Sequence, residues 1–100
     1  MKVNFNTPFS DCFGNKIEGK NIAGQICLFL FNLSTMSGSP VPAEKKYMAY
    51  SLCNRISKSP EEVELTTEEA SFIKEVSSEV MSAGAYGQIA DIIEGNSINI

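Results

Sequence analysis

The first twenty residues alternate between apolar and polar positions over short stretches. Val3 and Phe5 are separated and flanked by polar residues, which is the pattern of a half-buried strand. Gly14-Asn15 lies between two short segments and is typical of a two-residue hairpin loop, in which Gly supplies a positive φ. Asp11 precedes Gly14 by three residues and is a common turn residue. We therefore expect a β-hairpin in residues 1–20.

An apolar run follows Asn21, a residue that suits a helix N-cap. Ile26–Phe31 is short enough that a strand would also explain it, but the wider spacing favours a helix. Leu28 and Phe31 extend the apolar surface around the helix, which predicts a central, nearly enclosed element. If the chain does not enclose these two side chains, we expect a partner to cover them. The apolar face consists of Ile22, Ile26, Phe29, Leu30 and Leu33.

A second helix is predicted over residues 43–57, after a loop of Ser, Gly and Pro at 35–42. Pro42 suits the first turn of this helix. Tyr47 and Tyr50 flank its inner face, where each ring can pack while its hydroxyl stays in water. Residues 59–65 then predict a single turn and an extended bridge. The inner face of the helix consists of Ala49, Leu52, Cys53 and Ile56.

Two more helices complete the prediction. Thr66 and Glu69 form a capping box, from which a helix is expected to run from Thr67 to Ala83 and to end at Gly84. A last helix begins near residue 85 and ends at Gly95. The expected inner faces are Ala70, Ile73, Val76, Val80 and Ala83 for the third helix, and Tyr86, Ile89, Ala90 and Ile93 for the fourth.

These elements predict an α+β fold in a single domain that spans residues 1–100. The hairpin occupies 1–20 and about four helices occupy 21–95. Residues 96–100 form a tail, in which Ile98 and Ile100 alternate with polar residues. The tail is expected to be either loose or an added strand.

Composition argues against an enzyme. The chain has no histidine, so the Ser-His-Asp and Cys-His arrangements and His-ligated zinc are absent. It has no glycine-rich phosphate-binding motif. Three cysteines, Cys12, Cys27 and Cys53, are widely spaced and are expected to be buried, reduced thiols. We expect no catalytic residue, no cofactor and no metal.

The N-terminal residues do not predict a targeting or membrane segment. Polar residues follow Met1 where a signal peptide needs an apolar core. The run Ile26–Phe31 spans only about 9 Å as a helix, against the roughly 30 Å of a bilayer. We expect a soluble protein of the cytoplasm.

Charge is divided unevenly along the chain, which has a net charge of −4. Residues 1–58 carry a net charge of +4, and residues 59–100 carry −8. This asymmetry has two explanations. Either both halves are solvated faces of one domain, or the second half forms an acidic flank that binds a basic partner. That partner could be the lysine-bearing face of a second copy of the chain. Tyr86 lies among small residues and is either part of a tight helix corner or an interface anchor. The candidate surface consists of Glu61, Glu62, Glu64, Glu68, Glu69, Glu75, Glu79 and Tyr86.

The basic residues do not predict nucleic-acid binding. Lys45, Lys46, Arg55 and Lys58 form only a small patch, and the net negative charge opposes a phosphate backbone.

Three segments carry a resemblance to a known group. They are Thr7-Pro8-Phe9 with Asp11-Cys12-Phe13-Gly14-Asn15, then Lys46-Tyr47 with Leu52 and Arg55-Ile56, and finally Val63-Glu64-Leu65-Thr66 with Glu69, Gly84-Ala85-Tyr86-Gly87-Gln88-Ile89 and Ile93-Glu94. With these features the chain resembles small uncharacterised proteins encoded in tailed-phage and prophage genomes. The resemblance implies a phage accessory protein that acts through protein–protein contacts in the bacterial cytoplasm or in the particle.

Three functions remain open from the sequence, of which the least favoured is a small enzyme that would need a deep polar pocket holding a carboxylate with a strongly raised pKa. The first is a non-catalytic interaction module that assists phage assembly or structure and can self-associate. The alternative is a small acidic inhibitor of a host protein that binds a basic site.

Overall fold

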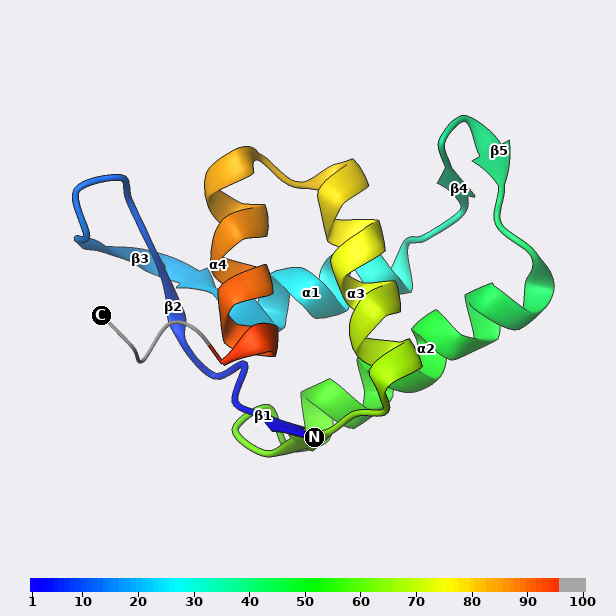
Figure 1. The fold of residues 1–100 in the computed structure, drawn as a ribbon, viewed down its shortest axis with the longest axis horizontal. Helices are drawn as coiled ribbons and strands as arrows, with labels where there is room; N and C mark the ends of the chain where they lie inside the picture. The colour runs from blue at the N-terminus through cyan, green and yellow to red at the C-terminus, as the bar shows by residue number, and fades with distance from the viewer. Residues whose placement is uncertain (96–100) are drawn as a thin grey trace.

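The computed structural model describes residues 1–95, which fold as short antiparallel strands and four helices (Figure 1). This is the α+β architecture predicted from the sequence. The predicted tail at 96–100 lies outside the described residues. The elements are β1 Lys2–Val3, β2 Pro8–Ser10, β3 Lys16–Asn21, α1 Ile22–Phe31, β4 Thr35–Met36, β5 Ser39–Pro40, α2 Ala43–Lys58, β6 Val63–Glu64, α3 Thr67–Val80 and α4 Ala83–Glu94.

The predicted hairpin is formed by β2 and β3, and in Figure 1 it projects beside the helices. Its loop covers residues 11–15 and is therefore longer than the two-residue loop predicted at Gly14-Asn15. The Asp11 N–H donates to the Asn15 carbonyl at 2.8 Å, which closes the longer loop. The Asp11 carboxylate accepts from the N–H groups of Phe13 and Asn15, both at 2.9 Å. Gly14 has φ +88°, as the turn chemistry predicted.

The first strand pairs with a distant segment and not within the hairpin. β1 is antiparallel to β6, with Val3 opposite Val63. Phe5 follows β1 and is fully buried. Its N–H donates to the Pro60 carbonyl at 2.8 Å, and its carbonyl accepts from the Ala23 N–H at 3.0 Å. The N-terminal segment therefore joins the bridge at 59–65 to the start of α1.

The apolar run after Asn21 is a helix, because the Asn21 side chain accepts from the Ala23 N–H at 2.9 Å and starts α1 there. The expectation that this helix is nearly enclosed is wrong. Leu28 and Phe31 are 58% and 65% exposed. α1 packs against α2 and α3, and these neighbours leave its opposite side uncovered.

The predicted loop at 35–42 contains a small hairpin of β4 and β5. Ser37 and Gly38 form its two-residue turn, with φ +52° and +79°. A positive φ is unfavourable for serine, and tertiary contacts stabilise it here. The Glu79 carboxylate accepts from the Ser37 N–H at 2.8 Å and from its hydroxyl at 2.9 Å.

The second helix begins after Pro42, and its predicted inner face is buried. The capping box of Thr66 and Glu69 starts α3 as predicted. α3 ends at Val80, however, and not at Ala83. The Ser82 hydroxyl accepts from the Ala85 N–H at 3.3 Å and starts α4 early, so Gly84 lies inside α4.

This early helix start corrects two predicted core positions. Val80 is 50% exposed and Ala83 is also exposed. Gly95 ends α4 with φ +73°, as predicted. The core cluster is formed by Val3, Phe5, Phe9, Ile22, Ala23, Ile26, Leu30, Ala49, Leu52, Cys53, Ile56, Val63, Leu65, Ala70, Phe72, Ile73, Val76, Ile89 and Ile93.

Candidate functional site

The structure divides the predicted acidic surface into carboxylates that have a partner within the chain and carboxylates that have none among residues 1–95. Glu62 pairs with the Lys2 ammonium at 3.4 Å, and Glu64 pairs with the Met1 amine at 3.0 Å. Glu79 holds the β4–β5 turn through Ser37. These three carboxylates therefore have internal partners that the sequence spacing did not reveal.

Glu69 is the least exposed of the predicted surface carboxylates, with a side chain that is 17% exposed. Its two oxygens accept from the Arg55 guanidinium at 2.8 and 3.1 Å. Arg55 also donates to the Glu64 carbonyl at 2.9 Å, so one side chain joins α2, β6 and the start of α3. The hydrogen bonds from Arg55 lower the pKa of Glu69 below its ordinary value. This pair is an internal clamp and not part of a binding surface.

Three glutamates of the predicted surface remain available to a partner. The carboxylates of Glu61, Glu68 and Glu75 make no hydrogen bond or ion pair within residues 1–95. Glu68 and Glu75 are seven residues apart and lie on the same outward side of α3. Tyr86 is half-buried on α4, and Lys74 of α3 pairs with Glu94 of α4 at 2.7 Å.

Large apolar side chains form a second exposed surface, which we call the aromatic face: Leu28 and Phe31 on α1, and Tyr47 and Tyr50 on α2. Their exposed fractions lie between 50% and 70%. The two tyrosine rings have centroids 6.2 Å apart and are tilted by 42°. At roughly 200 Å² for a large side chain, the face exposes about 500 Å² of apolar area. This is near the upper end of the largest patch on a typical monomer.

The contact between Cys27 and Cys53 holds α1 beside α2, the two helices that carry the aromatic face. Each thiol donates to the other residue's carbonyl, at 3.6 Å from Cys27 and 3.5 Å from Cys53. α1 and α2 run in opposite directions across this contact (Figure 1). Phe31 lies one turn after Cys27, and Tyr50 lies about one turn before Cys53, so both flank the same seam. The spacing of residues in the sequence does not reveal this arrangement, because it depends on how the two helices cross.

The three cysteines are not equivalent. Cys12 is exposed on the hairpin loop, which corrects the expectation of three buried thiols. Cys27 is half-buried and Cys53 is buried. Burial, together with the adjacent Cys53, raises the pKa of the Cys27 thiol from 9.0 to about 11. A disulfide-exchange reagent should therefore distinguish these thiols.

We expect one fast and two slow thiols when the folded protein reacts with an aromatic disulfide near neutral pH. A thiol with a pKa of about 11 forms about 100-fold less thiolate than one at 9.0, and the thiolate is the nucleophile. Cys12→Ser should remove the fast phase, and Cys27→Ser should leave it intact. Three equal rates in the folded protein would contradict this assignment.

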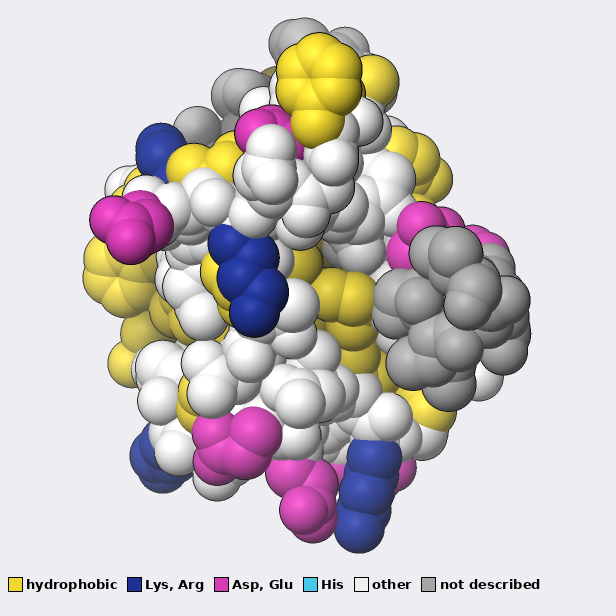
Figure 2. Space-filling view, turned by 90° about the vertical axis from the view of Figure 1, so that its left-hand side faces the viewer, with side chains coloured by type: hydrophobic (Ala, Val, Ile, Leu, Met, Phe, Trp, Pro, Cys, Tyr) yellow, Lys and Arg dark blue, Asp and Glu magenta, His cyan; other side chains and the backbone are white. Residues whose placement is uncertain are grey.

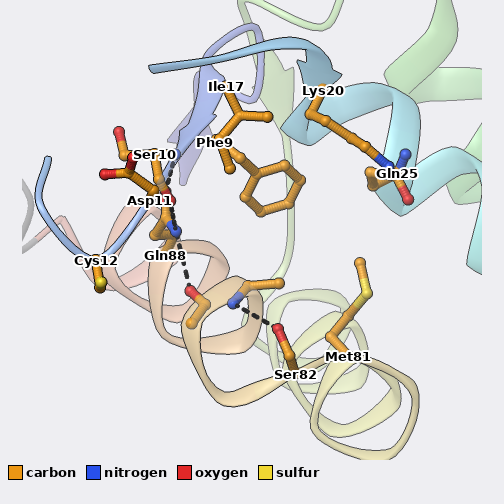
Figure 3. Close-up of a pocket in the computed structure, with 12 residues that line it drawn as sticks. Phe9, Ser10, Asp11, Cys12, Ile17, Lys20, Gln25, Met81, Ser82 and Gln88 are labelled. Carbon is orange, nitrogen blue, oxygen red and sulfur yellow. Dashed lines mark hydrogen bonds between the residues drawn. The ribbon is translucent and has the colours of Figure 1, made fainter. Parts of the chain in front are cut away.

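A cleft of about 350 Å³ lies between the hairpin and the start of α4 (Figure 3). Figure 3 shows Phe9 inside it, with Lys20 and Gln25 on one side and Met81 and Ser82 below. Gln88 is fully occupied: its Oε1 accepts from the Ser10 N–H at 2.8 Å, and its Nε2 donates to the Ser10 carbonyl at 3.0 Å. The amide therefore fixes β2 to α4 and is not available to a ligand.

The hairpin side of the molecule carries a second and larger hollow. Figure 2 shows hydrophobic side chains exposed in recesses between polar atoms on this side. A cleft of about 1000 Å³ lies between the N-terminal segment, β2 and α4. Its charged lining residues are Lys2, Asp11 and Asp91. The two carboxylates of this lining are both exposed, and the hydrogen bond from the Asn15 backbone lowers the pKa of Asp11 below its ordinary value.

Residues 1–95 show no arrangement of side chains suited to metal binding. Within them no group of three or more His, Cys, Asp or Glu could hold a metal ion. Every buried side-chain nitrogen or oxygen atom in this range has a hydrogen-bond partner. None of the four helices combines the length and the hydropathy needed to cross a membrane.

Comparisons with known proteins add no assignment. No family model, curated protein or solved structure matches the chain. The two surface features that bear on function are the aromatic face and the distribution of charge.

Proposed function

We propose that this protein is a non-catalytic protein–protein interaction module. The observation that carries the proposal is the aromatic face, because four large side chains on two packed helices are each at least half exposed, and the largest apolar patch of a monomer is often a functional surface. A standard interface buries about 800 Å² on each partner, of which somewhat more than half is apolar. The face supplies about that apolar share.

The sequence resemblance suggests the setting of this interaction. We propose a phage-encoded accessory protein that contributes to assembly or structure in the bacterial cytoplasm or in the particle. A role in docking agrees with a chain that has no histidine and no phosphate-binding motif.

The proposal predicts that Phe31→Ser and Leu28→Ser, made together, reduce capture of virion or assembly proteins from phage-infected lysate by about tenfold or more. Apolar anchors at an interface centre typically contribute this much. The matched control is Val80→Ser, because Val80 is 50% exposed but lies at the end of α3, outside the aromatic face. Capture of such proteins that is equal for all three forms, or that fails for the unaltered chain, would contradict the proposal.

The alternative, an acidic inhibitor of a host protein, is favoured by the uncompensated carboxylates of Glu61, Glu68 and Glu75. An arm with uninfected lysate separates the two functions. The double variant Glu68→Lys with Glu75→Lys is compared with the double variant Phe31→Ser with Leu28→Ser. If only the first abolishes capture of a host protein, the function is inhibition and not assembly. Glu69 is unsuitable for this arm because its substitution would remove the clamp with Arg55.

A further inference from the structure

The outward side of α2 carries a pattern that is complementary to itself. Glu44, Tyr47, Asn54 and Lys58 are exposed, and Ser51 is half-buried. These five positions follow each other at alternating steps of three and four residues, so they form one stripe along the helix. Tyr50, which is 50% exposed, lies beside the stripe and packs against Tyr47.

Charge is distributed along this stripe in a defined order. Glu44 is in the first turn of α2 and Lys58 is in the last. Neither side chain makes a hydrogen bond or ion pair with another residue in the described part of the chain. Ser51 lies midway between them. The stripe therefore ends in opposite charges and has a small side chain at its centre.

We propose that α2 pairs antiparallel with α2 of a second copy about a two-fold axis beside Ser51. In this register Glu44 lies opposite the partner's Lys58, and the same ion pair repeats at the other end. Tyr47 lies within one residue of the level of the partner's Asn54, about 1.5 Å along the axis. Ser51 meets the partner's Ser51, where small side chains permit close approach of the helices. The antiparallel helix dipoles also attract each other.

The proposed pairing uses a face that the fold leaves open. The opposite side of α2 contributes Ala49, Leu52 and Ile56 to the core, so pairing through the stripe disturbs no buried contact. Pairing also covers Tyr47 and part of Tyr50, which belong to the aromatic face. The inference rests on the proposed function, since it names a second copy as one partner of the module.

Charge reversal tests this register directly. Sedimentation equilibrium of the full chain should show a dimer that weakens at high salt, because the ion pairs are solvent-exposed. Glu44→Lys alone and Lys58→Glu alone should each weaken dimerisation by about tenfold or more, since attraction becomes repulsion at both ends. Glu18→Lys is the matched control, because Glu18 is exposed on β3 and far from this stripe in the chain.

Mixing the two variants gives the decisive measurement. The Glu44→Lys chain presents two cations along the stripe, and the Lys58→Glu chain presents two carboxylates. Each variant alone should be mainly monomeric, whereas an equimolar mixture of the two should form a heterodimer. The double variant Glu44→Lys with Lys58→Glu should dimerise like the unaltered chain. Circular dichroism checks that each variant remains helical.

Two results would overturn the inference. One is an unaltered chain that stays monomeric at every concentration, and the other is a mixture that associates no better than its components. A monomeric chain that still captures phage proteins through Phe31 would leave the proposed function standing and reject the self-pairing. A chain that dimerises but captures no phage protein would support the self-pairing and reject the proposed role in phage assembly.

Discussion

Phe5→Ala is expected to lower the free energy of unfolding by about 3–5 kcal/mol, the usual range for removing a fully buried phenylalanine. Phe5 is 0% exposed and lies where the N-terminal segment meets α1 and the 59–65 bridge. Its alanine variant would leave a cavity at this junction. A typical domain has only 5–15 kcal/mol of stability, so thermal unfolding should begin roughly 15–30 °C lower.

The hairpin tip offers the matched control for this substitution. Phe13 has the same side chain but is 85% exposed, so Phe13→Ala should change the free energy of unfolding by less than about 0.5 kcal/mol. Urea denaturation of both variants measures the difference. Similar losses at the two positions would show that Phe5 is not in the core.

Removing the guanidinium of Arg55 is expected to have the second large effect. Arg55→Ala deletes two hydrogen bonds to the Glu69 carboxylate and one to the Glu64 carbonyl. Hydrogen bonds to charged groups contribute more than neutral ones, and the 17% exposure of Glu69 limits screening by water. We expect a loss of about 2–3 kcal/mol at neutral pH.

This clamp should also depend on pH with a defined sign. Arg55 lowers the pKa of Glu69 below its ordinary value of 4.5, so the folded state binds the proton less readily than the unfolded state. The stabilisation is therefore complete above pH 4.5 and is lost as the pH falls through the lowered pKa of the folded state. The difference in stability between the unaltered chain and Arg55→Ala should shrink over that acid range.

Two controls make the clamp experiment specific. Arg55→Lys keeps the charge but not the paired donors, so it should restore only part of the stability. Lys74→Ala removes the more exposed ion pair with Glu94 and should cost no more than about 1 kcal/mol. If Arg55→Ala loses no more stability than Lys74→Ala, Glu69 is not held by a clamp.

Short-range signals in the sequence were sufficient for most helix boundaries. Asn21, Thr66 with Glu69, and Gly95 act on backbone groups within a few residues, so their patterns can be read without a fold. The prediction failed at the end of α3, where apolar spacing continued past the competing N-cap Ser82. The apolar spacing favoured a longer α3, whereas Ser82 favoured a new helix start. Periodicity alone did not show which of these two signals determines the boundary.

Contacts between distant segments could not be predicted in this way. The pairing of β1 with β6 joins residues about sixty positions apart, and each strand has only two residues. The partner of Ser37 is Glu79, which the sequence had assigned to an open acidic surface. Whether an exposed carboxylate has a partner within the chain depends on which cation or N–H the fold brings to it.

By itself, the sequence determined the α+β class, the four helices and most positions of their inner faces, because caps and apolar spacing act over one or two turns. Only the tertiary structure decided that Leu28 and Phe31 stay uncovered, that Glu69 is internal, and that α2 leaves an outward stripe. The physical reason is that the chemistry of a side chain specifies which groups it prefers to contact. The packing of elements that are distant in the sequence determines which of those groups lie close enough for contact.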